Sequence, residues 1–72
     1  MVLFSKNETP KYLIYKPRLT LYEVLFSCKI KDHHKHRWED GLVYRDKETG
    51  QIYTRAIVSF EDDKHKWEVY YS

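Results

Sequence analysis

One stretch of the chain, GLVYRDKETGQIYTRA, limits the possible folds more than any other. Two runs rich in Val, Ile, Tyr and Thr flank the polar sequence DKETG. Such side chains favour β-strands, and a short polar segment that ends in glycine is typical of a hairpin loop, because glycine readily takes the left-handed conformation that closes the loop. The stretch therefore predicts an antiparallel hairpin of residues 42–46 with 51–56, closed at Gly50.

Further strands are predicted on both sides of this hairpin. The run KYLIYK at 11–16 is short and apolar with lysine at each end, and Pro17 ends it because proline has no N–H for a sheet hydrogen bond. The run KWEVYY at 66–71 alternates between two sets of side chains, which is typical of a strand with one buried face. The polar sequence DDKHK at 62–66 predicts a turn before it.

Two segments are compatible with more than one structure. If residues 19–31 form a strand, alternate residues share one apolar face, which comprises Tyr22, Val24, Phe26, Cys28 and Ile30. If they form a helix, an apolar stripe arises from Leu21, Val24, Leu25 and Cys28, and Thr20 with Glu23 makes a capping box. Aromatic and β-branched residues favour the strand. The run IVSFEDD at 57–63 either extends the preceding strand or turns into a short helix.

The length of the chain limits it to one domain, residues 1–72. About five strands with short connections predict a mainly β fold, either a small antiparallel sheet or an SH3-like, partly open barrel, with one short helix as an option. A parallel sheet would need long crossovers, which this sequence lacks. The last strand is expected at a sheet edge, and its Trp and two Tyr favour a homodimer through this C-terminal edge strand.

Cysteine usage and charge restrict the functional class. Cys28 is the single cysteine, so an internal disulfide is impossible, which indicates a reducing compartment. With no signal peptide and no apolar run of about 20 residues, we expect a soluble cytoplasmic protein. Residues 1–38 carry a net charge of +5 and residues 39–72 carry −3. The basic first half is compatible with an acidic partner surface or a phosphate backbone.

The middle of the chain resembles a known family. The sequences YEVL at 22–25, WEDGLVYRD at 38–46 and GQIYTR at 50–55, followed by Phe60, resemble the DUF1653-like family of small bacterial and phage proteins of unknown function. The resemblance covers just over half of the chain and provides no catalytic residues. It implies a compact β fold, an origin in a phage or mobile element, and an accessory role in binding a macromolecule of the host or the phage.

The segment KIKDHHKHRWEDG at 29–41 is the main candidate site. By residue type, Cys28, His34, His36 and His65 could supply the four ligands of a zinc ion. However, no standard Cys/His spacing is present, and nearby lysines disfavour a dication. Interpreted as a long loop over 31–41, the segment favours protein binding, because Trp, Tyr and Arg are enriched at binding hot spots. The partner-binding candidates are Lys29, Lys31, His34, Lys35, His36, Arg37 and Trp38.

These patterns predict binding and not catalysis. The adjacent acids Glu39–Asp40 and Asp62–Asp63 are expected in turns, and no nucleophile, cofactor or metal motif is recognised. The leading hypothesis is a phage-type accessory protein that binds a host protein and modulates or inhibits it. The alternative is a single-stranded nucleic-acid-binding β-domain, whose surface aromatic residues would stack on bases. For stacking or interface contacts the candidates are Tyr44, Tyr53, Arg55, Trp67 and Tyr70.

Overall fold

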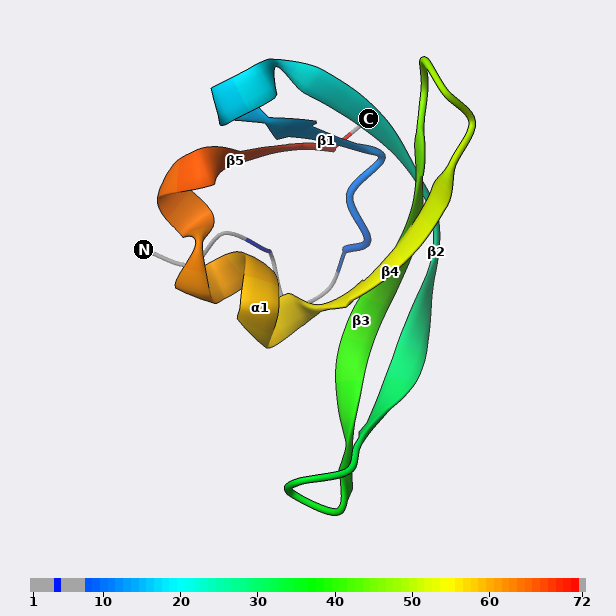
Figure 1. Ribbon diagram of the computed structural model, residues 1–72, viewed down its shortest axis with the longest axis vertical. Coiled ribbons are helices and arrows are strands. Elements are labelled where there is room, and N and C mark those ends of the chain that lie inside the picture. The colour runs from blue at the N-terminus through cyan, green and yellow to red at the C-terminus, as the bar shows by residue number, and fades with distance from the viewer. Residues whose placement is uncertain (1–3, 5–7, 72) are drawn as a thin grey trace.

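The computed structural model describes residue 4 and residues 8–71 of the chain. Five strands form one open sheet in which all neighbours are antiparallel, in the order β4-β3-β2-β1-β5 (Figure 1). The strands are β1 (Tyr12–Tyr15), β2 (Thr20–Asp32), β3 (Arg37–Asp46), β4 (Ile52–Ala56) and β5 (Trp67–Tyr70). The short helix α1 (Ile57–Asp62) and the 3-10 turns η1 (Lys16–Arg18) and η2 (Lys64–Lys66) connect them. The prediction of a mainly β, antiparallel fold is confirmed.

Both ambiguous segments adopt a single structure. Residues 20–32 form a strand, and the helical alternative is wrong, because β2 pairs with β1 at its start and with β3 along most of its length. The run after the predicted hairpin forms α1, so it does not extend β4. The predicted polar turn at 62–66 contains the end of α1 and the turn η2.

A β-bulge at Leu25 divides β2 into two parts, and the alternation of side chains between the two faces of the sheet is reversed after the bulge. Val24 lies opposite Tyr44, and Phe26 lies opposite the next residue, Val43, so Leu25 is the extra residue. Because side chains alternate along a strand, the extra residue transfers Phe26 to the face opposite the core. Phe26 is 58% exposed. The prediction of one shared apolar face is therefore wrong beyond Val24, because Phe26, Cys28 and Ile30 follow the bulge.

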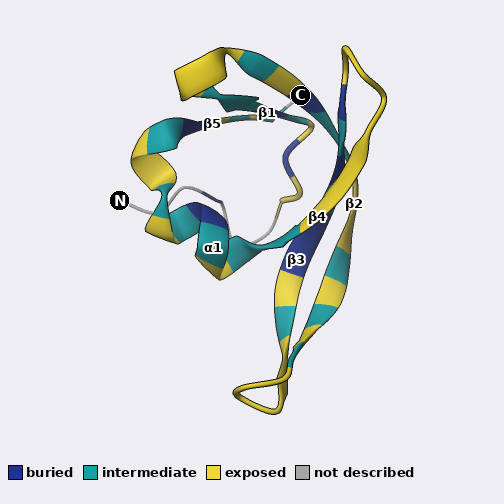
Figure 2. Ribbon diagram, in the orientation of Figure 1, coloured by how far each residue is buried: buried dark blue, intermediate teal, exposed yellow. Residues whose placement is uncertain are grey.

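The bent sheet encloses a small aromatic core. β2 curves so that β1 and β5 lie across from β3, and α1 packs against β3 and β4 (Figure 1). Buried residues lie on β3, α1 and β5 (Figure 2). The ring of Phe60, on α1, contacts the rings of Phe4, Tyr44 and Trp67 at centroid distances of 5.5, 5.6 and 4.8 Å. The buried hydrophobic residues are Phe4, Leu13, Tyr22, Leu42, Tyr44, Phe60 and Trp67.

Candidate functional site

The β2–β3 hairpin extends well beyond the core (Figure 1). Pairing continues as far as Asp32 opposite Arg37, and the connecting loop is residues 33–36. The prediction of an eleven-residue loop at 31–41, with Glu39 and Asp40 in a turn, is therefore wrong. The charged residues of this segment can occupy strand positions, because a projecting two-stranded ribbon is open to water on both faces. We call residues 29–40 the hairpin tip.

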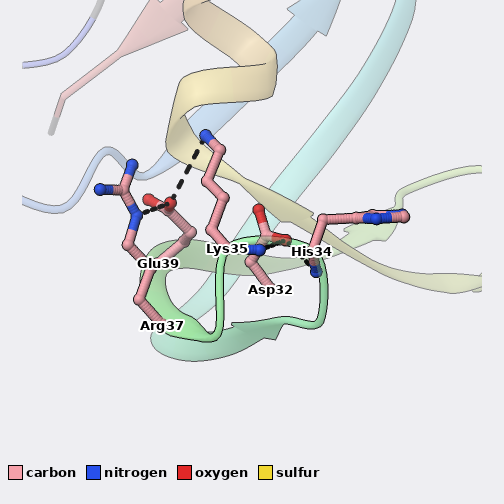
Figure 3. Close-up of polar contacts among 5 residues, drawn as sticks. All are labelled: Asp32, His34, Lys35, Arg37 and Glu39. Carbon is pink, nitrogen blue, oxygen red and sulfur yellow. Dashed lines mark hydrogen bonds and ion pairs between the residues drawn. The ribbon is translucent and has the colours of Figure 1, made fainter.

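Asp32 organises the turn at the end of the hairpin. Its Oδ1 accepts hydrogen bonds from the backbone N–H groups of His34 and Lys35, at 2.9 and 3.1 Å (Figure 3). This arrangement is typical of aspartate, whose side chain bonds to the backbone two or three residues further on. His36 then takes the left-handed conformation, with φ of 54°. Aspartate and histidine are among the residue types that make such a tight turn possible.

The two N–H donors also act on the acid–base behaviour of Asp32. Hydrogen bonds from the Lys35 and His34 backbone hold the pKa of this carboxyl below its usual value of 3.8. Because the folded pKa is lower than the unfolded one, Asp32 stabilises the turn above pH 3.8, and this contribution is lost as the pH falls below that value.

We expect the amide resonances of His34 and Lys35 to titrate with a midpoint below pH 3.8 in an NMR pH series. The bonds to the carboxylate weaken only when Asp32 is protonated, so both amides should report the same midpoint. The variant Asp32→Asn should abolish this titration while keeping a capping oxygen. A midpoint at or above pH 3.8 would show that the backbone N–H groups of the turn do not stabilise the charged carboxylate of Asp32.

Most basic side chains of the hairpin tip are already paired with acids. Arg37 Nε donates to Glu39 Oε1 at 2.9 Å, and Lys35 Nζ lies 3.9 Å from the same oxygen (Figure 3). Lys29 forms an ion pair with Asp40, directly across the hairpin. The four Lys and Arg residues of the tip therefore face three acids, Asp32 included. The field that this segment projects is weaker than its lysine content suggests.

Trp38 is the prominent apolar feature of the tip. It lies opposite Lys31 in the hairpin, and the Lys31 ammonium is 5.5 Å from the centre of a Trp38 ring. Trp38 remains 62% exposed. A cation above an indole ring is attracted by the ring's quadrupole, which orients the tryptophan. The tip thus presents a large aromatic side chain to solvent, with a positive charge above it.

The histidines of the tip do not form a metal site with other residues. His34 and His36 are exposed in the loop, while His65 lies in η2 and Cys28 in β2. Over residue 4 and residues 8–71, no group of three or more His, Cys, Asp or Glu side chains is placed so that it could hold a metal ion.

The residues predicted for stacking are not brought together on the surface. Tyr44 and Trp67 are buried in the core, because both lie on the inner face of the sheet, and their assignment as interface residues is wrong. Arg55 is also engaged internally: it donates to Ser59 and Asp63 and lies over aromatic rings of the core. Tyr53 and Tyr70 are exposed, but they lie on the two opposite edge strands.

Sequence reasoning missed exposed apolar residues on the outer face and a cleft. The bulge places Phe26 outside, and Leu21, Leu25 and Ile52 are exposed as well. A half-open cleft of about 1020 Å³ lies between the hairpin, α1 and the segment that precedes β1. Ser27, Asp40, Ile57, Val58 and Glu61 are among its lining residues. No local sequence signal marks either feature, since both depend on how distant elements pack.

Comparisons with known proteins give no indication of function, so the geometry of the site is the main guide to it. No protein-family model matches the chain, and searches of curated proteins and of solved structures find no match either. In the described part of the chain, no helix has the length and apolar character needed to cross a membrane.

Proposed function

We propose that the chain is a non-enzymatic binding module that engages another protein through the hairpin tip. This proposal rests on the exposed side chain of Trp38, which belongs to a projecting hairpin that contributes little to the core. Tryptophan is enriched among residues that dominate binding energy, because it fills a partner pocket with a large apolar surface. Trp38 is not part of the hydrophobic core, and its exposed position on a projecting hairpin favours a role in recognition.

The arrangement around Trp38 indicates what the partner surface offers. Lys31 supplies a positive charge beside the ring, and Lys29, Lys35 and Arg37 are pre-oriented by their ion pairs. A matching surface has an apolar pocket bordered by acidic groups. Following the resemblance to small phage proteins, we propose a host cytoplasmic protein as this partner, whose activity the chain modulates or inhibits by occupying that pocket.

The alternative, binding of single-stranded nucleic acid, has less support. Stacking platforms need several aromatic faces along one groove, and the burial of Tyr44 and Trp67 removes two of them. The acids of the tip also compete with phosphates for its cations. The two functions differ in salt dependence, because the logarithm of the affinity for nucleic acid falls linearly with log salt, and each phosphate contact makes that fall steeper.

We expect Trp38→Ala to weaken partner binding by at least tenfold and to leave the melting temperature nearly unchanged. The expected loss reflects the cost of removing a hot-spot residue, about 2 kcal/mol or more. Tagged wild-type protein would capture partners from a host lysate with and without nuclease treatment, and the affinity of each captured protein would then be measured with the purified variants.

Phe26→Ala is the matched control, because Phe26 is a similarly exposed aromatic residue on the neighbouring strand β2, outside the tip. This variant should bind like the wild type. Equal binding by Trp38→Ala and the wild type would contradict the assignment of the tip. Capture of nucleic acid alone, lost after nuclease treatment, would support the alternative function.

A further inference from the structure

The edge strand β4 lacks the features that usually protect a sheet edge. In the described residues, β4 pairs with β3 along one side, and its other side is an edge of the sheet. Natural edges carry charged side chains, Pro or a bulge, which prevent pairing with another chain. β4 reads IYTRA; it has no Pro and no bulge in its pairing with β3, and its one charge, on Arg55, is bound to Ser59 and Asp63 of the same chain. Its Ile52 and Tyr53 are 52% and 44% exposed.

The register shows which backbone groups of β4 point away from the sheet. The Asp46 N–H donates to the Gln51 carbonyl at 2.9 Å, so this pair is hydrogen-bonded across the hairpin. Hydrogen-bonded and non-hydrogen-bonded pairs alternate in an antiparallel ladder. Residues 53 and 55 therefore bond to β3, while Ile52, Thr54 and Ala56 direct their N–H and C=O groups outward.

The other edge, β5, offers a shorter surface. The Val24 N–H donates to the Lys11 carbonyl, so by the same alternation residues 12 and 14 of β1 face β5, and their partners Tyr70 and Glu68 face inward. Trp67 and Val69 remain on the outer side of β5. The Trp67 N–H already donates to the Lys64 carbonyl in η2. Within β5, only Val69 then directs both its backbone N–H and its backbone C=O outward and keeps both available for pairing.

We propose that a second copy of this chain pairs with β4, antiparallel and related by a two-fold axis at Thr54. This register places Thr54 opposite Thr54 of the partner subunit and Ile52 opposite Ala56 of the partner subunit. The Thr54 pair then exchanges two hydrogen bonds, and the Ala56 N–H of each subunit donates to the Ile52 carbonyl of the other, while the Ala56 carbonyl accepts the first hydrogen bond of α1. The Gln51 side chain, which donates to the Ile52 carbonyl at 3.2 Å, would turn away to admit the partner strand.

Side-chain complementarity selects a second copy as the occupant. Thr–Thr is a favourable cross-strand pair, and Ile52 packs on a small residue without a clash. On the inner face Tyr53 lies opposite Arg55 of the partner subunit, whose guanidinium stays bound to Ser59 and Asp63 of its own subunit, so this pair adds no unpaired charge to the interface. No like charges face each other in this register. An isologous interface needs this kind of self-complementarity, since the same strand serves both subunits.

The test is sedimentation velocity over a concentration series, with variants at both edges. The interface is small, so we expect a monomer–dimer equilibrium that is visible at high concentration. Thr54→Pro removes an outward N–H that β3 does not use, and should yield a monomer at every concentration. Val69→Pro, the corresponding change on β5, should dimerise like the wild type.

A second variant keeps the proposal testable if proline disturbs folding. Thr54→Lys leaves the backbone intact and sets two like charges opposite each other, so it should also be monomeric, with the circular dichroism of the wild type. A wild-type protein that stays monomeric throughout would overturn the proposal. A dimer that survives Thr54→Pro and Thr54→Lys would overturn it as well, and loss of that dimer in Val69→Pro would place the interface at β5.

Discussion

Phe60→Ala is expected to lower the free energy of unfolding by about 3–5 kcal/mol and to leave much of the chain unfolded at room temperature. Phe60 is fully buried and contacts the rings of Phe4, Tyr44 and Trp67. A core of this size rarely supplies more than about 3–5 kcal/mol of net stability, so one such cavity can consume all of it. Urea denaturation followed by near-UV circular dichroism measures the loss.

Phe26→Ala provides the comparison for this measurement. The same chemical change is made at a side chain that lies outside the core, so the expected loss is below about 1 kcal/mol. Similar losses in the two variants would mean that α1 does not complete the core, and that the enclosed arrangement of sheet and helix is incorrect.

Arg55→Ala should cost about 2–3 kcal/mol of stability, the second-largest effect that we expect. The Arg55 side chain donates to Ser59 Oγ and Asp63 Oδ2, both at 2.9 Å, and so joins β4 to α1 and the residue that follows it. Its guanidinium also lies 5.1 and 5.3 Å from ring centres of Phe60 and Trp67. Urea denaturation of Arg55→Ala and the wild type gives the difference directly.

Two further variants separate the causes of this loss. Arg55→Lys keeps the charge but not the planar fork of donors, so it should recover less than half of the stability. Arg45→Ala removes an arginine that is more exposed than Arg55 and pairs with Glu23, and should cost less than about 1 kcal/mol. Full recovery by lysine would show that charge alone matters and that the geometry around Arg55 does not.

The sequence predicts local features of this fold well. The hairpin closed at Gly50 is found as β3 and β4, with Gly50 at φ of 80°, because turn chemistry and strand propensity act over a few neighbouring residues. The last strand and the antiparallel class follow from the same kind of local pattern. The bulge at Leu25 has no such signature, because it arises from the pairing of β2 with β3 and not from the residues next to it in the sequence.

The candidate site was only partly predictable for a related reason. The sequence marks the segment 29–41 as distinctive, but its charges favour a loop over 31–41, although cross-strand pairs such as Lys29 with Asp40 make charged strands stable in water. Residue type alone makes Tyr44 and Trp67 candidates for stacking or interface contacts, whereas both are buried. Which face is buried depends on the position of α1, and local periodicity does not fix that position.

The most direct test of the proposed function is an NMR titration of isotope-labelled protein with a partner captured by the wild type. If the hairpin tip is the binding surface, the largest changes in amide resonances should lie within residues 31–38, and the Trp38 indole N–H should move with them. The same titration with Trp38→Ala should give little change. Changes confined to β4, β5 or the outer face around Phe26, with residues 31–38 unaffected, would contradict the account.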